Sequence, residues 1–204
     1  MKSQWEQSEI VKRYAKRRHQ EFELVTAERY FLPDALKGMR NMLDVGCASG
    51  GMFNMIRQMG NEIPYTGIDF SRPSIQNAQE LYGHDATFIQ ANAHQIPFPN
   101  FTFSFVHTRG LMPHIRDWKK VLHELLRVTR MKLLIDMRFS STPSMTPYSI
   151  ASTADPVDFY TVSQDEFYDA IPSDIRHIKR YDRPGFAHRG VRQILIEATM
   201  LLSR

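Results

Sequence analysis

The stretch NMLDVGCASGGMF, residues 41–53, decides the fold of this chain. It opens with an apolar run that ends in an acid, and small residues follow at positions 46–51. The apolar run predicts a short buried strand, and the small residues allow a sharp turn from that strand into a helix. The first amides of a helix have no partner within it, so they can donate to a ligand. The small residues of the turn let the backbone approach that ligand closely.

The glycines of this turn do not have the spacing of a dinucleotide-binding turn. A GxGxxG pattern placed on Gly46 requires glycine where Ala48 stands, and the sequence is instead D-x-G-x-A-x-G, from Asp44 to Gly50. A carboxylate facing a pyrophosphate is unfavourable, so Asp44 favours a ligand with an ammonium or another cation at this end. The next predicted strand ends in Asp69, whose side chain is suited to accept both hydroxyls of a ribose. Together these residues predict a nucleoside with a positive tail and no phosphate.

Strands and helices alternate along the middle of the chain. Strands are predicted at 42–45, 63–69, 86–90, 101–107 and 131–138, and helices at 52–59, 73–82 and from about 117. Gly60, Ser71 and Gly83 provide the expected helix caps. This alternation predicts an α/β protein with a mostly parallel, Rossmann-like sheet that has helices on both faces. Closing strands at 174–181 and 191–200 are expected to form an antiparallel hairpin at one edge.

The chain has 204 residues, which suits one domain with a well-buried core. Residues 1–38 are expected to form an N-terminal helical cap, 39–138 the ligand-binding core, and 139–204 a substrate loop, a helix and the hairpin. One or two amphipathic helices are predicted between residues 6 and 30. The polar, proline-bearing stretch 140–156 is a candidate lid, and Ser163 with Glu166 forms a capping box for a following helix.

Composition limits the possible classes of protein. Hydrophobic residues make up 42% and charged residues 24%, as in a globular protein without membrane spans, and we expect a cytoplasmic protein. A net charge of +4 comes with basic clusters at 12–19 and 176–192, which allow a nucleic-acid partner but are more typical of a solvated face. No His, Cys and carboxylate set has the spacing of metal ligands, and the single Cys47 excludes a multi-thiolate zinc site. We therefore predict no metal.

The chain resembles the class I S-adenosylmethionine-dependent methyltransferases, especially the small-molecule branch that includes the quinone-biosynthesis type. The resemblance covers roughly residues 42–136 and follows the order and spacing of the family. It rests on the blocks LDVGCASG, YTGIDFS, ANAHQIPFPNFTFSFV and LMPHIRDWKKVLHELLRVTR. It implies the family's seven-stranded fold, S-adenosylmethionine as cofactor and S-adenosylhomocysteine as product.

The resemblance also implies roles for individual residues. Asp44, Gly46, Ala48 and Gly50 would line the methionine part, with Cys47 in the same turn; Asp69 would hold the ribose and Phe70 would pack on the adenine. Asn92, Ala93, His94 and Thr108 complete the predicted cofactor site. Where the family usually has an acid that accepts from the adenine amino group, this chain has Asn92, whose amide oxygen is also an acceptor.

Two further departures from the family pattern are visible. Ser104 replaces an aspartate usually found ahead of the fourth strand. Thr129, Arg130 and Met131 stand where the family usually has Lys-Pro-Gly-Gly before the fifth strand. These changes affect the details of the predicted site more than the choice of cofactor.

Methyl transfer from a sulfonium depends mainly on holding the acceptor close to the methyl group and in line with the bond that breaks. A base is needed only when the accepting atom carries a proton. His107 ends the fourth predicted strand and His114 follows it, so these two are the candidate catalytic bases. A purely structural role is an equal alternative for each. Tyr14, Tyr148, Phe159 and Tyr160 are candidates to close the pocket, although ordinary packing is favoured for them.

The favoured function is therefore methylation of a small molecule. Methylation of RNA or protein is the first alternative, supported only by the basic clusters. A protein that binds the nucleoside without catalysis is the second, and a nicotinamide-dependent oxidoreductase is a distant one because of Asp44 and Ala48. The sequence does not identify the acceptor or the oligomeric state.

Overall fold

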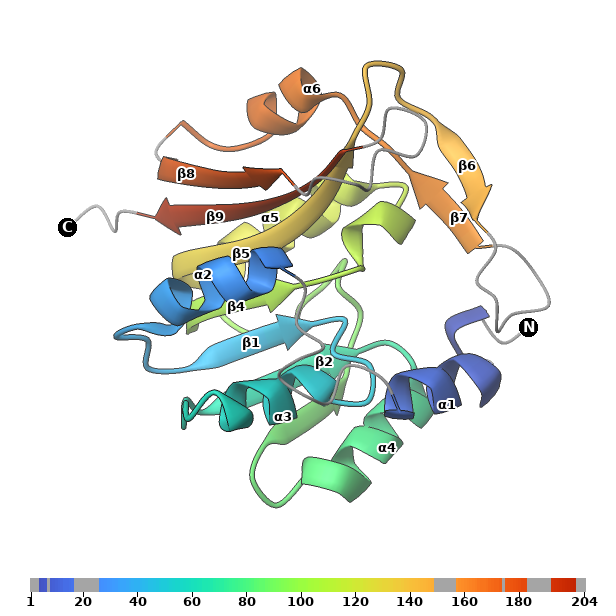
Figure 1. The fold of residues 1–204 in the computed structure, drawn as a ribbon, viewed down its shortest axis with the longest axis vertical. Coiled ribbons are helices and arrows are strands. Elements are labelled where there is room, and N and C mark those ends of the chain that lie inside the picture. The colour runs from blue at the N-terminus through green and yellow to red at the C-terminus, as the bar shows by residue number, and fades with distance from the viewer. Residues whose placement is uncertain are drawn as a thin grey trace.

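The computed structural model describes residues 4–6, 8–16, 26–148, 157–173, 175–182 and 192–200. Its centre is a seven-stranded sheet with the strand order β3-β2-β1-β4-β5-β9-β8 (Figure 1). The strands are β1 (Met42–Val45), β2 (Tyr65–Asp69), β3 (Thr87–Gln90), β4 (Phe103–Thr108), β5 (Thr129–Phe139), β8 (Ile175–Asp182) and β9 (Arg192–Met200). Strands β3, β2, β1, β4 and β5 pair in parallel, and β9 is antiparallel to both β5 and β8. The predicted fold class is confirmed.

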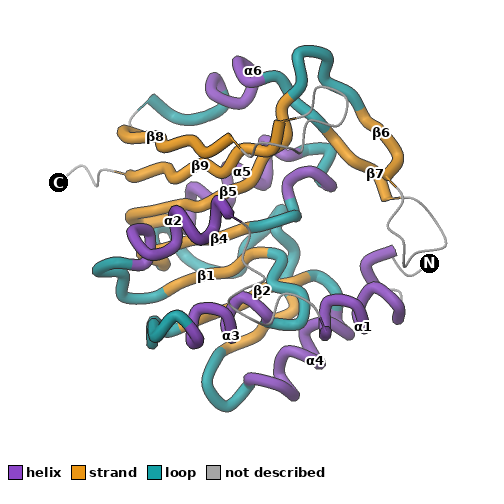
Figure 2. The backbone as a smooth tube through the Cα atoms, viewed as in Figure 1, coloured by secondary structure: helices purple, strands orange, loops and turns teal. Residues whose placement is uncertain are grey.

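Helices lie on both faces of the sheet (Figure 2). They are α1 (Ser8–Lys16), α2 (Thr26–Leu36), α3 (Gly51–Gln58), α4 (Arg72–Tyr82), α5 (Trp118–Val128) and α6 (Gln164–Asp169), with short 3-10 helices η1 (Gln4–Glu6) and η3 (Met112–His114). Ser71 and Ser163 cap α4 and α6 as predicted, since each side chain accepts a backbone hydrogen bond from the residue three positions later. One or two N-terminal helices are expected, and the described residues form two, of which the second extends to Leu36 with Pro33 inside it.

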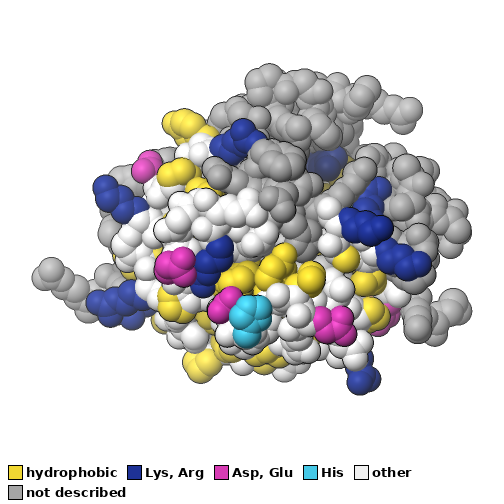
Figure 3. All heavy atoms as spheres, turned by 60° about the horizontal axis from the view of Figure 1, so that its bottom comes forward, with side chains coloured by type: hydrophobic (Ala, Val, Ile, Leu, Met, Phe, Trp, Pro, Cys, Tyr) yellow, Lys and Arg dark blue, Asp and Glu magenta, His cyan; other side chains and the backbone are white. Residues whose placement is uncertain are grey.

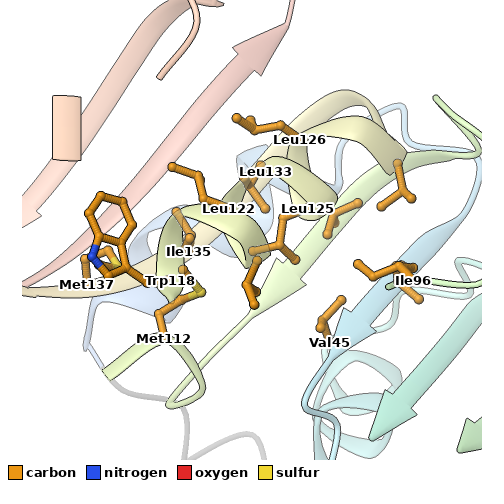
Figure 4. Packing of buried hydrophobic residues seen from close by; sticks show 14 of the residues in the cluster. Val45, Ile96, Met112, Trp118, Leu122, Leu125, Leu126, Leu133, Ile135 and Met137 are labelled. Atoms are coloured by element: carbon orange, nitrogen blue, oxygen red, sulfur yellow. The ribbon is translucent and has the colours of Figure 1, made fainter. Parts of the chain in front are cut away.

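Alternate residues of the central strands face two separate hydrophobic cores. Val106 and Leu133 belong to a core shared with α5 and α6, whereas Phe105 and Leu134 belong to a core shared with α2, α3 and α4. This follows from the two-residue period of a strand, which sends successive side chains to opposite faces. In the first core the labelled side chains of α5 point towards those of β5 (Figure 4). Burial on both faces explains why these strands read as continuous apolar runs.

The candidate lid differs from the single loop predicted for residues 140–156. Part of it forms β6 (Met145–Tyr148), which pairs antiparallel with β7 (Val157–Tyr160) in a separate two-stranded ribbon. The ribbon depends on pairing with a segment that lies beyond the apparent loop, and such partners are not visible in local sequence. Pro147 is tolerated because a two-stranded ribbon consists of edge strands. Residues 149–156 lie outside the described residues.

Ser104 lies at the end of β4 that is remote from the carboxyl ends of the strands. Its hydroxyl accepts hydrogen bonds from the backbone N–H groups of Arg40 and Asn41, at 2.8 and 3.0 Å. The same oxygen lies 2.7 Å from the carbonyl oxygen of Asn41, to which it donates. This departure from the family pattern therefore ties the start of β4 to the segment that leads into β1.

Gly67, in the middle of β2, is required by close packing against the turn that follows β1. A methyl group at this position would lie 2.8 Å from Sγ of Cys47 and 2.9 Å from Cδ1 of Phe88. We expect Gly67→Ala to lower the free energy of unfolding by about 1–3 kcal/mol, as overpacking of a core does. Urea denaturation of this variant, of Cys47→Ala and of the double variant measures the effect. The double variant should recover part of the loss, and strict additivity would contradict the proposed clash.

Candidate functional site

A cavity of about 370 Å³ lies at the carboxyl ends of β1, β2, β3 and β4. The N-terminal segment covers it, with α1 lying against α4 (Figure 1). Its lining comes from the N-terminal helices (Trp5, Ile10, Tyr14), the end of β1 (Val45, Gly46, Ala48), the end of β2 (Ile68, Asp69, Phe70, Ser71, Ser74), the end of β3 (Ala91, Asn92, Ala93, His94) and the segment after β4 (Arg109, Gly110, Leu111, His114, Ile115). Crevices at this edge of open α/β sheets are the usual place for ligands.

The turn after β1 is held in shape by the end of β2. The backbone N–H groups of Gly46 and Cys47 both donate to the carbonyl oxygen of Ile68, at 2.8 and 3.0 Å. Asp69 Oδ2 accepts from the N–H of Ala48 at 3.0 Å, and Oδ1 accepts from the N–H of Ser71 at 2.8 Å. Ala48 has a φ of 48°, a left-handed conformation that is uncommon for a residue other than glycine. Asp69 therefore fixes the turn as well as lining the cavity.

The carboxyl group of Asp69 is also electrostatically unusual. Burial raises its pKa to about 6, and the backbone hydrogen bonds from Ser71 and Ala48 oppose that rise without cancelling it. Each oxygen is engaged by one backbone donor, and an ionised carboxylate offers about four lone-pair positions in all. The group therefore retains acceptor positions for two ligand hydroxyls.

The structure brings together most, but not all, of the predicted cofactor residues. Those that line the cavity are Gly46, Ala48, Asp69, Phe70, Asn92, Ala93 and His94. Asp44, Cys47, Gly50 and Thr108 do not line it. The side chains of Cys47 and Thr108 are buried in the protein, and Gly50 caps α3 in a left-handed conformation, with Phe88 and Tyr82 beside it.

Asp44 is the largest departure from the predicted site, because its carboxylate is bound by protein groups. It is 3% exposed, and Tyr65 donates its hydroxyl hydrogen to Oδ2 at 2.5 Å. His107 Nδ1 lies 2.6 Å from Oδ1, and His107 Nε2 lies 3.8 Å from Oε1 of Glu28 on α2. Asp44 therefore supports the sheet under the cavity and is not among the residues that line it.

His107 is held in its protonated form. Burial alone would lower its pKa, but the negative charge of Asp44, the hydrogen bond to it and the neighbouring Glu28 outweigh burial and raise the pKa to about 9. The imidazolium is 2% exposed and lies between two carboxylates. Because it already carries its proton and does not line the cavity, this position does not match the base predicted from the sequence.

A second, partly buried ion pair continues the same cluster towards the cavity. Arg109 Nη1 donates to Oδ2 of Asp136 at 2.8 Å, and Arg109 Nε lies 3.6 Å from Oε1 of Glu28. Asp136 Oδ1 accepts from the backbone N–H of Gly110 at 2.8 Å. Sequence reasoning missed Glu28, Tyr65, Arg109 and Asp136. For Asp136 a signal existed, because it is an acid inside the otherwise apolar run LLIDM.

His114 lines the cavity, as predicted, at the meeting point of three segments. Its ring packs edge-on against Trp5 of η1, with centroids 4.8 Å apart, and against Phe159 of β7 at 5.8 Å. The guanidinium of Arg138 lies over the Phe159 ring, 3.9 Å from its centroid. Of the aromatic candidates for pocket closure, Tyr14 also lines the cavity, and Tyr160 does not. The side chain of Tyr148 lies outside the described residues.

The described part of the face drawn in Figure 3 carries scattered Lys and Arg side chains, with apolar side chains near its centre. Residues 17–19 of the first basic cluster and the side chains of the second lie outside the described residues. Within the described ranges no helix is both long and apolar enough to cross a membrane. Those ranges also contain no group of three or more His, Cys, Asp or Glu side chains placed to hold a metal ion.

The buried imidazolium predicts an alkaline limit to stability. Because the pKa of His107 is raised, its contribution is complete below pH 6.5 and is lost as the pH rises through about 9. We expect the free energy of unfolding to fall by about 2–3 kcal/mol between pH 7 and 10. His107→Gln should be less stable at pH 7 and should lack this fall, whereas His123→Gln, at an exposed position of α5, should retain it. Urea denaturation across this pH range measures both, and equal profiles for all three proteins would contradict the assignment.

Comparison with known proteins agrees with this geometry. A family model described as a methyltransferase domain matches residues 42–132. Demethylmenaquinone methyltransferase of Listeria welshimeri is 30% identical over 95 residues, which are 44% of this chain and 40% of that protein. Ajmaline N-methyltransferase of Rauvolfia serpentina is 31% identical over 103 residues, which are 48% of this chain and 35% of that protein. The aligned segments therefore span well under half the length of these relatives.

Solved structures extend the similarity to most of the fold. The N-terminal domain of EvdMO1 with SAH bound has a TM-score of 0.68 at 15% identity, covering 88% of this chain and 84% of that chain. The [4+2]-cyclase SpnF has a TM-score of 0.62 at 16% identity, covering 85% and 81%. These identities show a shared fold only. Together with the matched domain model and the order of the sequence blocks, they confirm the predicted resemblance of this chain to the class I S-adenosylmethionine-dependent methyltransferases.

Proposed function

We propose that this protein transfers a methyl group from S-adenosylmethionine to a small-molecule acceptor. The observation that supports this most strongly is Asp69, a carboxylate that lines the cavity and also holds the preceding turn. The cavity, at about 370 Å³, lies in the range of about 300–1,000 Å³ that is typical of small-molecule sites. It is open to a nucleoside because Gly46 and Ala48 present little side chain to it.

The residues present fit the parts of this cofactor. Asp69 would hold the ribose hydroxyls, and Phe70 with the segment at 91–94 would contact the base. Gly46 and Ala48 would leave room for the methionine part. Asp44 is not available to bind the ammonium directly. Instead, the buried carboxylates of Asp44, Glu28 and Asp136 outnumber the cations His107 and Arg109 beside the cavity, which favours a positively charged ligand.

The chain's own contribution to the reaction is positioning, exclusion of water and control of one proton. S-adenosylmethionine supplies an electrophilic methyl group when it is bound. The N-terminal segment covers the cavity with Trp5, Ile10 and Tyr14, which limits the access of water. His114 lines the same cavity, and in this proposal its imidazole accepts a proton from an acceptor hydroxyl or amine. The in-line geometry of transfer follows from the chemistry of displacement at a sulfonium.

The choice of a small-molecule acceptor is supported by the relatives and by the shape of the site. The names of both relatives identify a small molecule, demethylmenaquinone in one case and ajmaline in the other. The cavity here is closed on one side by Trp5 of η1 and Tyr14 of α1, which suits a compact acceptor. A second candidate function is ligand binding without methyl transfer, because the similar fold of SpnF belongs to a protein described as a cyclase.

Binding of the cofactor should depend on the charge of Asp69. Because protonation near pH 6 removes an acceptor, we expect the affinity for S-adenosylhomocysteine to fall about tenfold between pH 7.5 and 5. Asp69→Asn should bind at least tenfold more weakly at pH 7.5, with little further change on acidification. Titration calorimetry measures both, with the exposed Asp34→Asn as the matched control. A pH profile in Asp69→Asn like that of the wild type would assign the titration to another group.

The role of His114 separates methyl transfer from binding alone. We expect His114→Gln to lower kcat by about 100-fold or more if the acceptor must lose a proton, while cofactor affinity changes less than twofold. A panel of metabolites, with formation of S-adenosylhomocysteine as the signal, identifies the acceptor first. His123→Gln on α5 is the control. Equal turnover of His114→Gln and the wild type would leave His114 as a packing residue, and no turnover with any acceptor would favour the second candidate function.

A further inference from the structure

Asn92 occupies the position where the family pattern has a carboxylate that accepts a hydrogen bond from the adenine amino group. It follows β3, is exposed, and lines the cavity. Its Oδ1 accepts a hydrogen bond from the backbone N–H of His94 at 3.0 Å. A backbone N–H requires an acceptor, so this contact identifies the oxygen end of the amide and excludes the exchanged assignment.

The ring of His94 also contacts this oxygen. Nδ1 of His94 lies 2.9 Å from Oδ1 of Asn92, and Nε2 lies 2.7 Å from Oδ1 of Asp117, the residue that caps α5. Which ring nitrogen donates depends on the tautomer, so the contact that fixes the orientation of the amide is the one from the His94 backbone. The hydrogen bond from His94 is also the main reason that the pKa of Asp117 lies below its usual range. The Asn92 oxygen therefore faces His94, whose ring in turn contacts Asp117.

The hydrogen bond from the His94 backbone determines which end of Asn92 faces the ligand. Its oxygen is directed to His94, and no described residue accepts a hydrogen bond from its Nδ2 group. A carboxylate in this place would offer a second oxygen to the ligand, but Asn92 offers an N–H donor. A donor at this point fits an acceptor atom of the base, such as a ring nitrogen of adenine, and it does not fit the adenine amino group.

We propose that Asn92 donates from Nδ2 to a ring nitrogen of the bound base. The site therefore recognises the base through an acceptor atom of its ring and not through its amino group. The inference rests on the proposed function, in which the base lies against residues 91–94. His94 is a positioning residue here, since it acts only by orienting Asn92. The direction of the hydrogen bond between side chain and base is thus the reverse of that made by the carboxylate of the family pattern, although Asp and Asn have the same shape.

The direction in which one substitution changes the affinity tests this hydrogen bond. Asn92→Asp places a negatively charged acceptor where Nδ2 stands, so we expect S-adenosylhomocysteine to bind about tenfold more weakly, as measured by calorimetry at pH 7.5. If Asn92 instead accepted from the amino group, the carboxylate would bind equally well or more tightly, and that result would overturn the inference. Gln95→Glu adds the same charge three positions along the chain, at an exposed residue that does not line the cavity. It should stay within twofold of the wild type.

A modified ligand tests the same point on the unchanged protein. The analogue of S-adenosylhomocysteine that lacks the 6-amino group keeps the ring nitrogens. We expect the wild type to bind it within about threefold of S-adenosylhomocysteine, and a loss of tenfold or more would overturn the inference. Failure of the wild type to bind S-adenosylhomocysteine at all would instead overturn the proposed function, and the inference with it. The two failures are thus distinguishable.

Discussion

The hydrogen bonds that Asp69 accepts from Ala48 and Ser71 hold the site together. One carboxylate at the end of β2 fixes the turn after β1 and the start of α4, so two loops that are distant in sequence take their shape from a single side chain. The raised pKa of Asp69 shows that burial makes this charge costly. A ligand that offers further donors to the same group offsets that cost, which links the shape of the cavity to its ability to bind.

The sequence was sufficient to predict the order of elements in the sheet and the residues along one edge of the site. Strand and helix periods, with caps at Ser71 and Ser163, predicted the order of elements because those signals are local. The cavity residues Gly46 and Asp69 could be placed for the same reason, since each ends a strand of a parallel sheet. The ribbon of β6 and β7 was not predictable in this way, because its stability depends on pairing across residues 149–156.

The roles of Asp44 and His107 differ from those predicted, and both depend on the register between strands. Asp44 pairs with His107 across β1 and β4, and Tyr65 on β2 completes its hydrogen bonds from the other side. Neither the register nor the approach of Glu28 from α2 can be read from spacing along the chain. An acid in a ligand-binding motif was therefore interpreted as a ligand contact, whereas the fold uses it to hold a buried cation.

The trio of Glu28, Asp44 and His107 also limits how this sequence can change over generations. Removing Asp44 takes from the buried His107 its hydrogen-bonded partner, and removing His107 takes from the buried Asp44 its cation, at a cost of about 3–5 kcal/mol. That is a large share of the 5–15 kcal/mol by which domains are typically stable, so most single replacements would be eliminated by selection. Relatives that lack the histidine are expected to lack at least one of the acids as well. The three positions should then be inherited as a unit, and an alignment would show them changing together.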